Sequence, residues 1–219
     1  MDIFKAMEAR HSVRQYLDKK IPNELVEELN QEINDCNEEA GLHIQLITEE
    51  KEAFGGMMAH YGKFDQVQNY IALIGPKSKS LNEKIGYYGE KIVLKAQLLG
   101  LNTCWVAMTF SKGKSRAIIN KGEKLICVLS LGYGKTQGTI HKSKSIGELC
   151  DATVDMPDWF KKGMEAALLA PTAMNQQKFF ILLNQEKAIA RKTGGFYSDV
   201  DLGIVKYHFD VASGRKLGI

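Results

Sequence analysis

The chain has 219 residues, of which 44% are hydrophobic and 25% charged, with 29 Lys and Arg against 26 Asp and Glu and a formal net charge of +3. This composition is typical of a globular protein with one sizeable core. Because lysines and glutamates are interleaved without a basic stripe, we expect no nucleic-acid partner.

The sequence also argues against a membrane, a secreted or a metal-binding protein. No apolar run reaches the roughly 18 residues of a membrane helix, and the N-terminus lacks the apolar stretch of a secretion signal. The four cysteines are far apart with no CxxC pair, and no two histidines stand at the spacing of metal ligands. We therefore expect a reduced, cytoplasmic protein with no membrane association and no metal.

The first half of the chain alternates between helical and strand-like patterns. Residues 2–9 predict a short amphipathic helix, and Pro22 stands where a second helix should begin. Strands are expected at 42–48 and 69–75, with a helix interrupted by a glycine pair between them. The longest predicted helix spans residues 80–99, is apolar around most of its circumference and ends at Gly100.

The second half continues the alternation. We expect a strand at 102–108, a polar helix at 111–121 and a strongly apolar strand at 123–134. A short helix follows at 146–150, then a helix at 157–169, a strand at 178–184 and a last helix around 201–212. Since no stretch resembles a linker, we expect one α+β domain over residues 1–219 with a single sheet.

One internal similarity is visible. The helix and strand within residues 23–50 resemble those within 157–186, which suggests a weak repeat of two helix–strand units.

An anion-binding pattern opens the chain. In the segment RHSVRQY, Arg10, Ser12 and Arg14 occupy alternate positions, so on an extended backbone two guanidiniums and a hydroxyl point to one side. Lys142 and Lys144 repeat this alternation, and the five side chains together can neutralise a phosphomonoester. The alternative is that Arg10 caps the first helix and that the lysines are solvated.

The segment LAPTAMNQQ joins a predicted helix to a predicted strand. Its small residues would let a planar ligand approach the backbone, and the amides of Asn175 and Gln177 can meet the polar edge of a pyrimidine-like ring. The alternative is a loop capped by its own amides. The segment GYGKTQG (132–138) imitates a dinucleotide fingerprint, but no amphipathic helix follows it, so we reject that interpretation.

These segments together resemble the FMN-dependent nitroreductase-like flavoproteins. RHSVRQY is similar to that family's phosphate and ribityl segment, APTAMNQQKF to its segment against the flavin ring, LLGLNTCWVAM to the stretch near flavin N5, and HKSKSIGEL to its second phosphate segment. The ring-facing loop stands in the second helix–strand unit, as in a branch of the family in which that loop is transposed.

The resemblance implies an α+β fold with a central, mainly antiparallel sheet flanked by helices, and FMN as the cofactor. Hydride would pass from NADH or NADPH through FMN to a small organic acceptor, such as a nitro compound or a quinone. The residues implied as FMN contacts are Arg10, His11, Ser12, Arg14, Val106, Ala107, Met108, Lys142, Lys144, Pro171, Thr172, Ala173, Asn175 and Gln177. No catalytic side chain is implied.

Two related points stay open. The chain can instead be a related flavin enzyme of the flavin-destructase or dehalogenase type, or a flavin-binding protein without turnover. We also expect a homodimer, because the apolar helix at 80–99 and the apolar residues at 156–160 and 206–211 exceed what one sheet face covers, and because the family assembles in this way.

Overall fold

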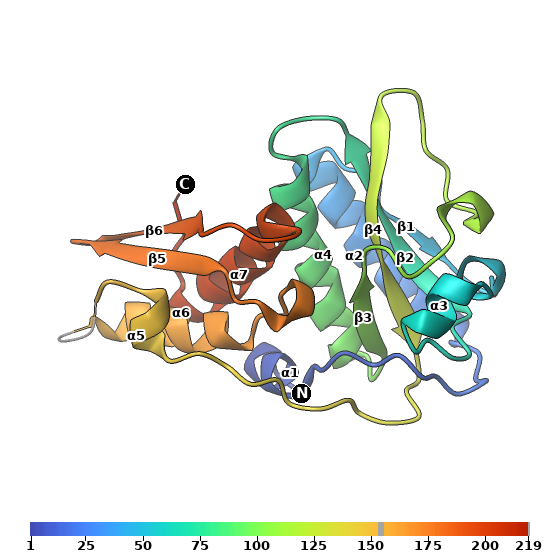
Figure 1. Cartoon of the computed structure of the whole chain (residues 1–219), viewed down its shortest axis with the longest axis horizontal. Helices are drawn as coiled ribbons and strands as arrows, with labels where there is room; N and C mark the ends of the chain where they lie inside the picture. The colour runs from blue at the N-terminus through green and yellow to red at the C-terminus, as the bar shows by residue number, and fades with distance from the viewer. Residues whose placement is uncertain (153–155, 219) are drawn as a thin grey trace. The chain divides into compact units, whose positions relative to one another are not determined.

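An antiparallel sheet of four strands forms one of two sheets in the computed structural model of this chain, which describes residues 1–152 and 156–218 (Figure 1). The chain divides into two compact units. The first contains Met1, Ala9–Leu81 and Ile92–Ile140, and the second contains Asp2–Glu8, Asn82–Lys91 and the residues from His141 onward. That residues 1–219 act as one domain stays a prediction.

The four-stranded sheet lies in the first unit. Its order is β1 (Gln45–Ile47), β2 (Asn69–Pro76), β4 (Glu123–Gly132), β3 (Asn102–Val106), and every neighbouring pair is antiparallel. The two central strands, β2 and β4, are buried at almost every position because their sequences are continuous apolar runs. The expected α+β fold with an antiparallel sheet is confirmed.

Helices and turns complete the first unit. Helix α2 (Asn23–Ala40) begins directly after Pro22 and ends at Gly41, whose φ of 63° is left-handed. A 3₁₀ turn (Glu52–Phe54) and α3 (Met57–Tyr61) form the expected helix broken by a glycine pair. Helix α4 (Leu81–Leu98) contributes residues to both units, and Gly100 follows it with a φ of 77°, as a terminating glycine should.

The second unit is mainly helical. It contains α1 (Ile3–Ala9), α5 (Ile146–Leu149), α6 (Asp158–Leu169), a 3₁₀ turn (Ala173–Asn175) and α7 (Ser198–Ser213). Strands β5 (Phe179–Asn184) and β6 (Lys187–Lys192) form an antiparallel hairpin, and its turn places Gln185 at a φ of 53°.

Three expectations about the fold are wrong. The described strands form two sheets rather than one. Strand β6 was not anticipated, because KAIARK buries only alternate apolar residues and is charged at its ends. The polar helix expected at 111–121 is only a 3₁₀ turn (Lys112–Lys114), since this stretch has no apolar face to bury, and Ile118 and Ile119 remain exposed.

The apolar surface that suggested a homodimer is covered by the chain itself. On α4, Ile85, Ile92 and Leu94 are fully buried, and so are Phe160 and Phe209 in the other two segments. This observation removes the surface argument for a dimer, although it does not test the dimer itself.

Helices α4 and α7 approach closely at two glycines of the second unit. A Cβ added to Gly86 would lie 2.0 Å from the carbonyl oxygen of Val200, and one added to Gly203 would lie 2.0 Å from that of Glu83. Because backbone atoms cannot yield as a flexible side chain does, only glycine fits at these two positions.

A buried polar pair also joins the helices of the second unit. His208 on α7 places Nδ1 3.1 Å from the carbonyl oxygen of Ala166 on α6, and Nε2 3.0 Å from Oε1 of Glu90 on α4. Since a carbonyl oxygen only accepts, Nδ1 carries a proton, and one further proton is shared between Nε2 and the carboxylate. Both side chains are fully buried, so the pair is satisfied without water.

We predict that Gly86→Ala will destabilise the protein. Overpacking of this kind costs roughly 1–3 kcal/mol, and the better helix propensity of alanine, about 1 kcal/mol, offsets only part of it. Gly113→Ala is the control, because a Cβ there meets nothing within 4 Å. Urea denaturation of the three proteins measures the difference, and an unchanged midpoint for Gly86→Ala would contradict the close contact.

Candidate functional site

The first unit carries the N-terminal anion-binding pattern beside strand β3. Ser12 forms a parallel bridge with Thr103, and the amide of Val13 donates to the carbonyl oxygen of Thr103 at 3.0 Å. The segment is therefore extended, as the alternation of Arg10, Ser12 and Arg14 requires. Arg10 is 3% exposed, which is rare for a guanidinium and not expected of a merely solvated cap.

These three residues gather around one buried thiol. Burial raises the pKa of Cys104 on β3, while the charge of Arg14, a hydrogen bond with Ser12 and the charge of Arg10 act in the opposite direction. All three side chains are therefore close enough to Cys104 to influence it. The pairing with β3 thus places Arg10, Ser12 and Arg14 in one extended segment at the edge of the sheet.

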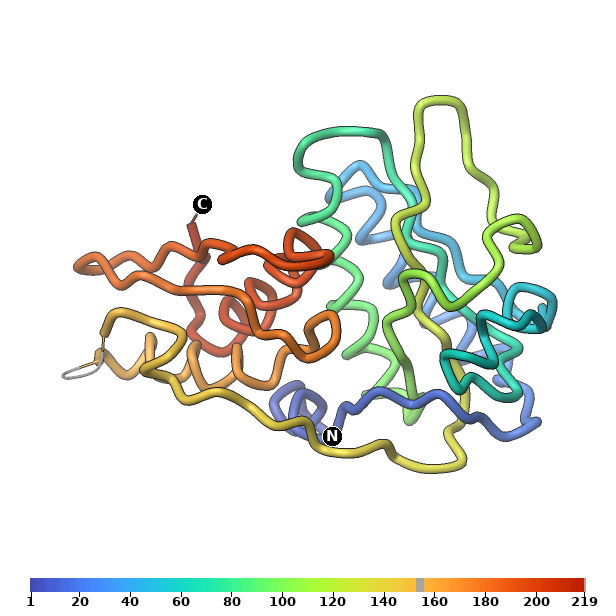
Figure 2. Tube along the Cα trace, viewed as in Figure 1, coloured from blue at the N-terminus to red at the C-terminus, as the bar shows by residue number. Residues whose placement is uncertain are grey.

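A glycine-containing loop covers this segment on its other side. The tube in Figure 2 follows residues 134–138 next to the N-terminal segment, and a Cβ added to Gly138 would lie 2.7 Å from Cβ of His11. Asn102 holds the loop, since its Oδ1 accepts from the amide of Gly134 at 2.9 Å and its Nδ2 donates to Gln137 at 3.0 Å. Residues 139–145, directly after GYGKTQG, are not helical, in agreement with the rejected dinucleotide interpretation.

The residues expected near flavin N5 follow the end of β3. The paired register of β3 and β4 ends at Val106 and Val128, so Ala107 and Met108 lie beyond the ladder. Val106 is buried, Ala107 is half-buried and Met108 is 61% exposed.

The second unit brings together the other group of predicted residues, in two segments that we call the strap (residues 141–144) and the loop (residues 172–177). The carbonyl oxygen of Lys142 accepts from Asn175 Nδ2 and from Gln177 Nε2, each at 2.8 Å. Oε1 of Gln177 accepts from the amide of Lys144 at 2.9 Å, and Lys144 Nζ lies 3.2 Å from the carbonyl oxygen of Gln177. The amides of Asn175 and Gln177 therefore bind the strap.

The remaining loop residues take part in the same arrangement. Thr172 Oγ1 accepts from the amide of Gln177 at 3.0 Å, and the strap is also held at its other end, where His141 Nε2 lies 2.9 Å from the carbonyl oxygen of Leu168. Pro171 and Ala173 are half-buried, and Lys142 is exposed. Loop and strap form one hydrogen-bonded assembly within this unit.

Asp201 on α7 anchors the loop, a role that no local sequence pattern indicates. Its Oδ1 accepts from the amide of Ala173 at 2.8 Å, and its Oδ2 accepts from Gln176 Nε2 at 2.7 Å. Gln176 Nε2 also donates to the carbonyl oxygen of Phe196 at 2.7 Å. Burial raises the pKa of Asp201 to about 6, against the hydrogen bonds from Gln176 and Ala173.

The sequence-predicted residues thus form two groups. Arg10, His11, Ser12, Arg14 and residues 106–108 belong to the first unit, whereas Lys142, Lys144 and residues 171–177 belong to the second. Sequence reasoning missed Asp201 and Asn102, because a single acidic or amide side chain in a helix or strand carries no local signal of its distant partner.

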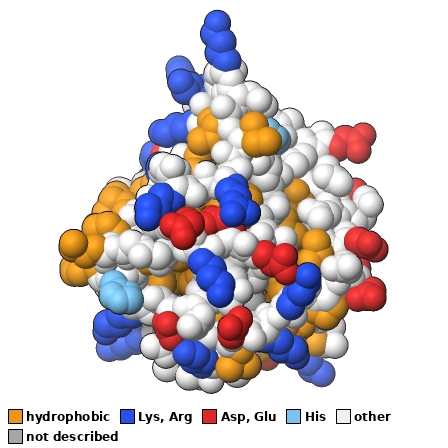
Figure 3. All heavy atoms as spheres, turned by 90° about the vertical axis from the view of Figure 1, so that its right-hand side faces the viewer, with side chains coloured by type: hydrophobic (Ala, Val, Ile, Leu, Met, Phe, Trp, Pro, Cys, Tyr) orange, Lys and Arg blue, Asp and Glu red, His pale blue; other side chains and the backbone are white. Residues whose placement is uncertain are grey.

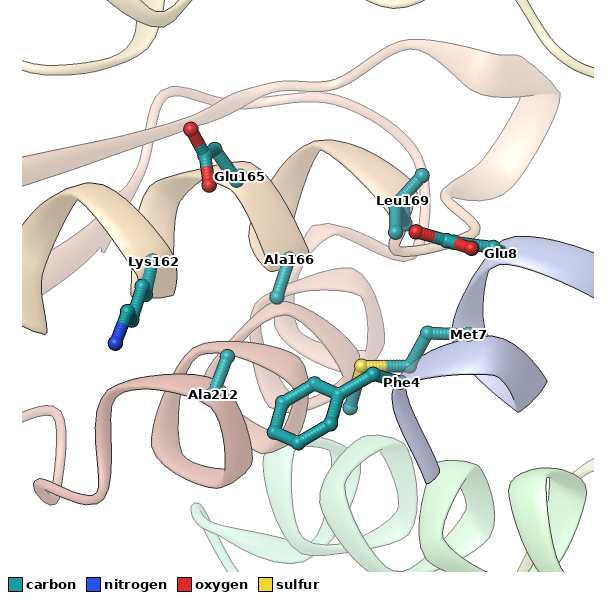
Figure 4. A pocket seen from close by; sticks show the side chains of 8 residues that line it. All are labelled: Phe4, Met7, Glu8, Lys162, Glu165, Ala166, Leu169 and Ala212. Atoms are coloured by element: carbon teal, nitrogen blue, oxygen red, sulfur yellow. The ribbon is translucent and has the colours of Figure 1, made fainter. Parts of the chain in front are cut away.

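A groove in the second unit lacks the features of a redox site. It has a volume of about 400 Å³ and lies between α1, α6 and α7, where it is lined by Phe4, Met7, Glu8, Lys162, Glu165, Ala166, Leu169 and Ala212. Figure 4 shows that the charged ends of Glu8, Lys162 and Glu165 point in different directions. Binding sites instead combine an apolar wall with convergent polar groups.

Two features are absent from the described part of the chain. Within residues 1–152 and 156–218, no three His, Cys, Asp or Glu side chains are grouped so that they could hold a metal ion. No helix in these ranges has the length and apolar character needed to cross a membrane.

The comparisons with known proteins give one family and several similar structures. Residues 2–213 match the family described as "Putative TM nitroreductase". None of the curated proteins matches the chain.

Among solved structures, a putative nitroreductase from Thermotoga maritima MSB8 is similar with a TM-score of 0.67 and 24% identity, over 97% of this chain and 83% of that one. A putative nitroreductase in complex with FMN from Desulfovibrio desulfuricans gives a TM-score of 0.55 and 14% identity, over 72% and 98%. A putative NADH dehydrogenase/NAD(P)H nitroreductase from Bacteroides thetaiotaomicron gives 0.52 and 17%, over 67% and 95%. At these identities the likeness shows the fold.

We predict a pH-dependent stability that originates from Asp201. Because its pKa is raised from 3.8 to about 6 on folding, the folded state binds more protons between these values. The free energy of unfolding should therefore fall as pH rises from 4 to 6, by at most about 3 kcal/mol from this group.

Asp201→Asn removes this contribution, so the stability of the variant relative to the wild type should increase as pH rises from 4 to 7. Asp199→Asn is the control, because Asp199 is exposed on the same helix and pairs with Lys192 at 2.6 Å. Denaturant titrations at several pH values measure both differences. If the free energies of unfolding of the wild type and Asp201→Asn changed with pH in parallel, the carboxyl group would not titrate in this range.

Proposed function

The chain belongs to the family described as "Putative TM nitroreductase", and from this premise we propose that it is an FMN-dependent oxidoreductase acting with NADH or NADPH on a small organic acceptor. Bound FMN supplies the hydride chemistry, which protein side chains lack. A nitro compound or a quinone is the proposed class of acceptor. We further propose that residues 1–219 act as one FMN-binding domain in the cytoplasm.

The residues present fit the phosphate of FMN. Arg10 and Arg14 offer guanidiniums, which match phosphate oxygens in bidentate geometry, and Ser12 offers a hydroxyl donor. His11 adds a further ring donor in the same segment. The extended pairing of this segment with β3, through Ser12 and Thr103, is the observation that carries the proposal.

Two other segments are proposed to contact FMN. Beyond the ladder of β3 and β4, the backbone amides of Val106, Ala107 and Met108 would orient the flavin ring near N5. In the second unit, Lys142 and Lys144 would add positive charge. Pro171, Thr172 and Ala173 would leave room for a planar ring, while Asn175 and Gln177 would act by holding the strap.

The name of the Desulfovibrio desulfuricans structure states an FMN complex, and that of the Bacteroides thetaiotaomicron structure states NADH and NAD(P)H. Both names support the proposed cofactor and donor. Titration of flavin-free protein with FMN and with riboflavin tests the proposal, because a phosphate site requires clearly tighter binding of FMN. Equal affinity for the two, or no binding of either, would contradict it.

Anaerobic mixing of the FMN-loaded protein with NADH or NADPH separates the proposal from its alternatives. Rapid loss of the yellow absorbance, followed by its return when an acceptor is added, supports a reductase. Persistent colour favours a binding protein without turnover. Chemical breakdown of the flavin favours an enzyme of the flavin-destructase type. Release of halide from a halogenated aromatic favours one of the dehalogenase type.

We predict that Arg14→Ala weakens FMN binding about tenfold or more, since a charge-assisted hydrogen bond contributes roughly 1.5–3 kcal/mol. Arg14 is exposed, so the fold should tolerate the change. Lys20→Ala is the control, because Lys20 is also exposed and pairs with Glu49 at 2.8 Å. Fluorescence titration gives both affinities, and riboflavin binding should be unaffected in either variant. If Arg14→Ala and the wild type bound FMN with equal affinity, Arg14 would not be part of the phosphate site.

One face of the first unit carries both charged and apolar side chains. Figure 3 shows lysine, arginine and acidic side chains interspersed over the face that it presents, with hydrophobic side chains between them.

Exposed apolar side chains are concentrated on α3, where Met57 and Tyr61 are 86% and 83% exposed and Met58 is 49% exposed. This helix is therefore the surface that we propose for a homodimer.

We predict that light scattering at micromolar concentration gives about twice the chain mass of 24.5 kDa. A stable interface buries on the order of 1,600 Å² or more, which α3 would supply only in part. Replacement of Met57 and Tyr61 by Asp should yield monomers, whereas Ile140→Asp, at another apolar position that is 84% exposed, should not. A wild-type monomer would contradict the dimer and leave the FMN proposal standing.

A further inference from the structure

The loop of the second unit has a costly backbone conformation. Met174, Asn175 and Gln177 have φ values of 52°, 53° and 46°, in the left-handed backbone region that residues other than glycine seldom adopt. Such a conformation persists only where surrounding contacts determine it. The hydrogen bonds of the loop therefore decide whether it keeps this shape.

Those bonds come from two sides. On the strap side, Asn175 and Gln177 bind the carbonyl oxygen of Lys142, and Gln177 binds the amide of Lys144. On the helix side, both carboxylate oxygens of Asp201 accept from the loop, one from the amide of Ala173 and one from the side chain of Gln176. Asp201 is 5% exposed, so water cannot readily replace it.

The carboxylate is chemically specific for this place. Both groups that face it are donors, an amide N–H and a side-chain NH₂, and only a carboxylate offers two acceptor oxygens in the same shape. An asparagine at this position would set its own NH₂ group against one of the two donors, whichever way its amide is turned. Asp201→Asn therefore preserves the shape while removing one of the two bonds.

We propose that Asp201 is a positioning residue for cofactor binding: it fixes the left-handed loop (172–177), and the loop in turn fixes the strap (141–144) that carries Lys142 and Lys144. This inference rests on the proposed FMN function, because the strap lysines are assigned to FMN there. Protonation of Asp201 turns one acceptor oxygen into a donor, so it should loosen the loop in the same manner as the asparagine.

The other charged and titratable groups on neighbouring elements are engaged separately. Asp199 pairs with Lys192 of β6 at 2.6 Å, and Lys206 pairs with Glu83 of α4 at 2.6 Å. The side chain of Lys178 lies close to Gly195, before α7. His141 on the strap binds the carbonyl oxygen of Leu168.

The test compares FMN affinity between pH 5 and 8 for the wild type, Asp201→Asn and Asp199→Asn. At pH 7.5 we expect Asp201→Asn to bind FMN about fivefold more weakly or worse, the equivalent of one lost hydrogen bond of about 1 kcal/mol. At pH 5 the wild type and Asp201→Asn should converge to within about twofold. Asp199→Asn should follow the wild type throughout.

The ratio of the two affinities is the decisive quantity. The FMN phosphate itself titrates near pH 6, as phosphate monoesters do, but this effect is common to all three proteins and cancels in the ratio. If Asp201 had a merely structural role, Asp201→Asn would have a lower melting temperature, but the ratio of its FMN affinity to that of the wild type would not change with pH. A constant ratio would therefore overturn the inference.

Amide hydrogen exchange without FMN supplies a second readout. In Asp201→Asn, the amide of Lys144 should exchange faster, because it donates to Gln177 and lies on the strap rather than on the loop. Unchanged exchange there would overturn the link from Asp201 to the strap, even if the wild type failed to bind FMN and the proposed function were lost. Gln176→Ala, which removes the second donor and leaves Asp201 in place, should change affinity and exchange in the same direction. It replaces Asp201→Asn if that variant does not fold.

Discussion

The close contact between α4 and α7 is the constraint on which the second unit depends. Because Gly86 and Gly203 lack side chains, the two backbones approach to a distance at which any added Cβ would collide with a carbonyl oxygen. At this separation His208 can reach both Glu90 on α4 and the carbonyl oxygen of Ala166 on α6. Helix α7 is thereby fixed against two others, and its first turns become a rigid base for the loop.

The polar groups of the second unit explain why amides accumulate in the segment that joins α6 to β5. A left-handed loop exposes its backbone donors and acceptors in directions that no helix or strand satisfies, so side chains must bind them. Gln176 faces α7, whereas Asn175 and Gln177 face the strap. The small residues before them, Pro171 to Ala173, let the chain turn without filling the space beside it. One sequence feature thus satisfies the local fold, and the same segment is the one that we propose for a planar ligand.

The first unit places its charged groups by a different means. The N-terminal segment pairs with β3 through Ser12 and Thr103 and therefore adds a partner to the edge of the sheet. Val13 and Tyr16 anchor it in the core, and the hydroxyl of Tyr16 lies 2.8 Å from that of Ser130 on β4. Arg14 lies between these two buried residues, and Arg10 and Ser12 lie just before Val13, so the backbone that carries all three is held in place. Rigid support of this kind limits the entropy lost when an anion binds.

The sequence by itself determined the order of the main helices and strands, the apolar character of β2 and β4, and the segments that carry the family's motifs. These features depend on local periodicity and on residue types such as Pro22 and Gly100, whose conformational limits act within a few residues. Only the tertiary structure decided that the strands form two sheets, that the apolar surface of α4 is covered by the chain itself, and that Asn175 and Gln177 bind the strap. It also assigned Asp201 to the loop, 24 or more positions away along the chain. Such pairings depend on which groups meet after the helices pack, and a buried donor selects its acceptor by position in space rather than by distance along the sequence.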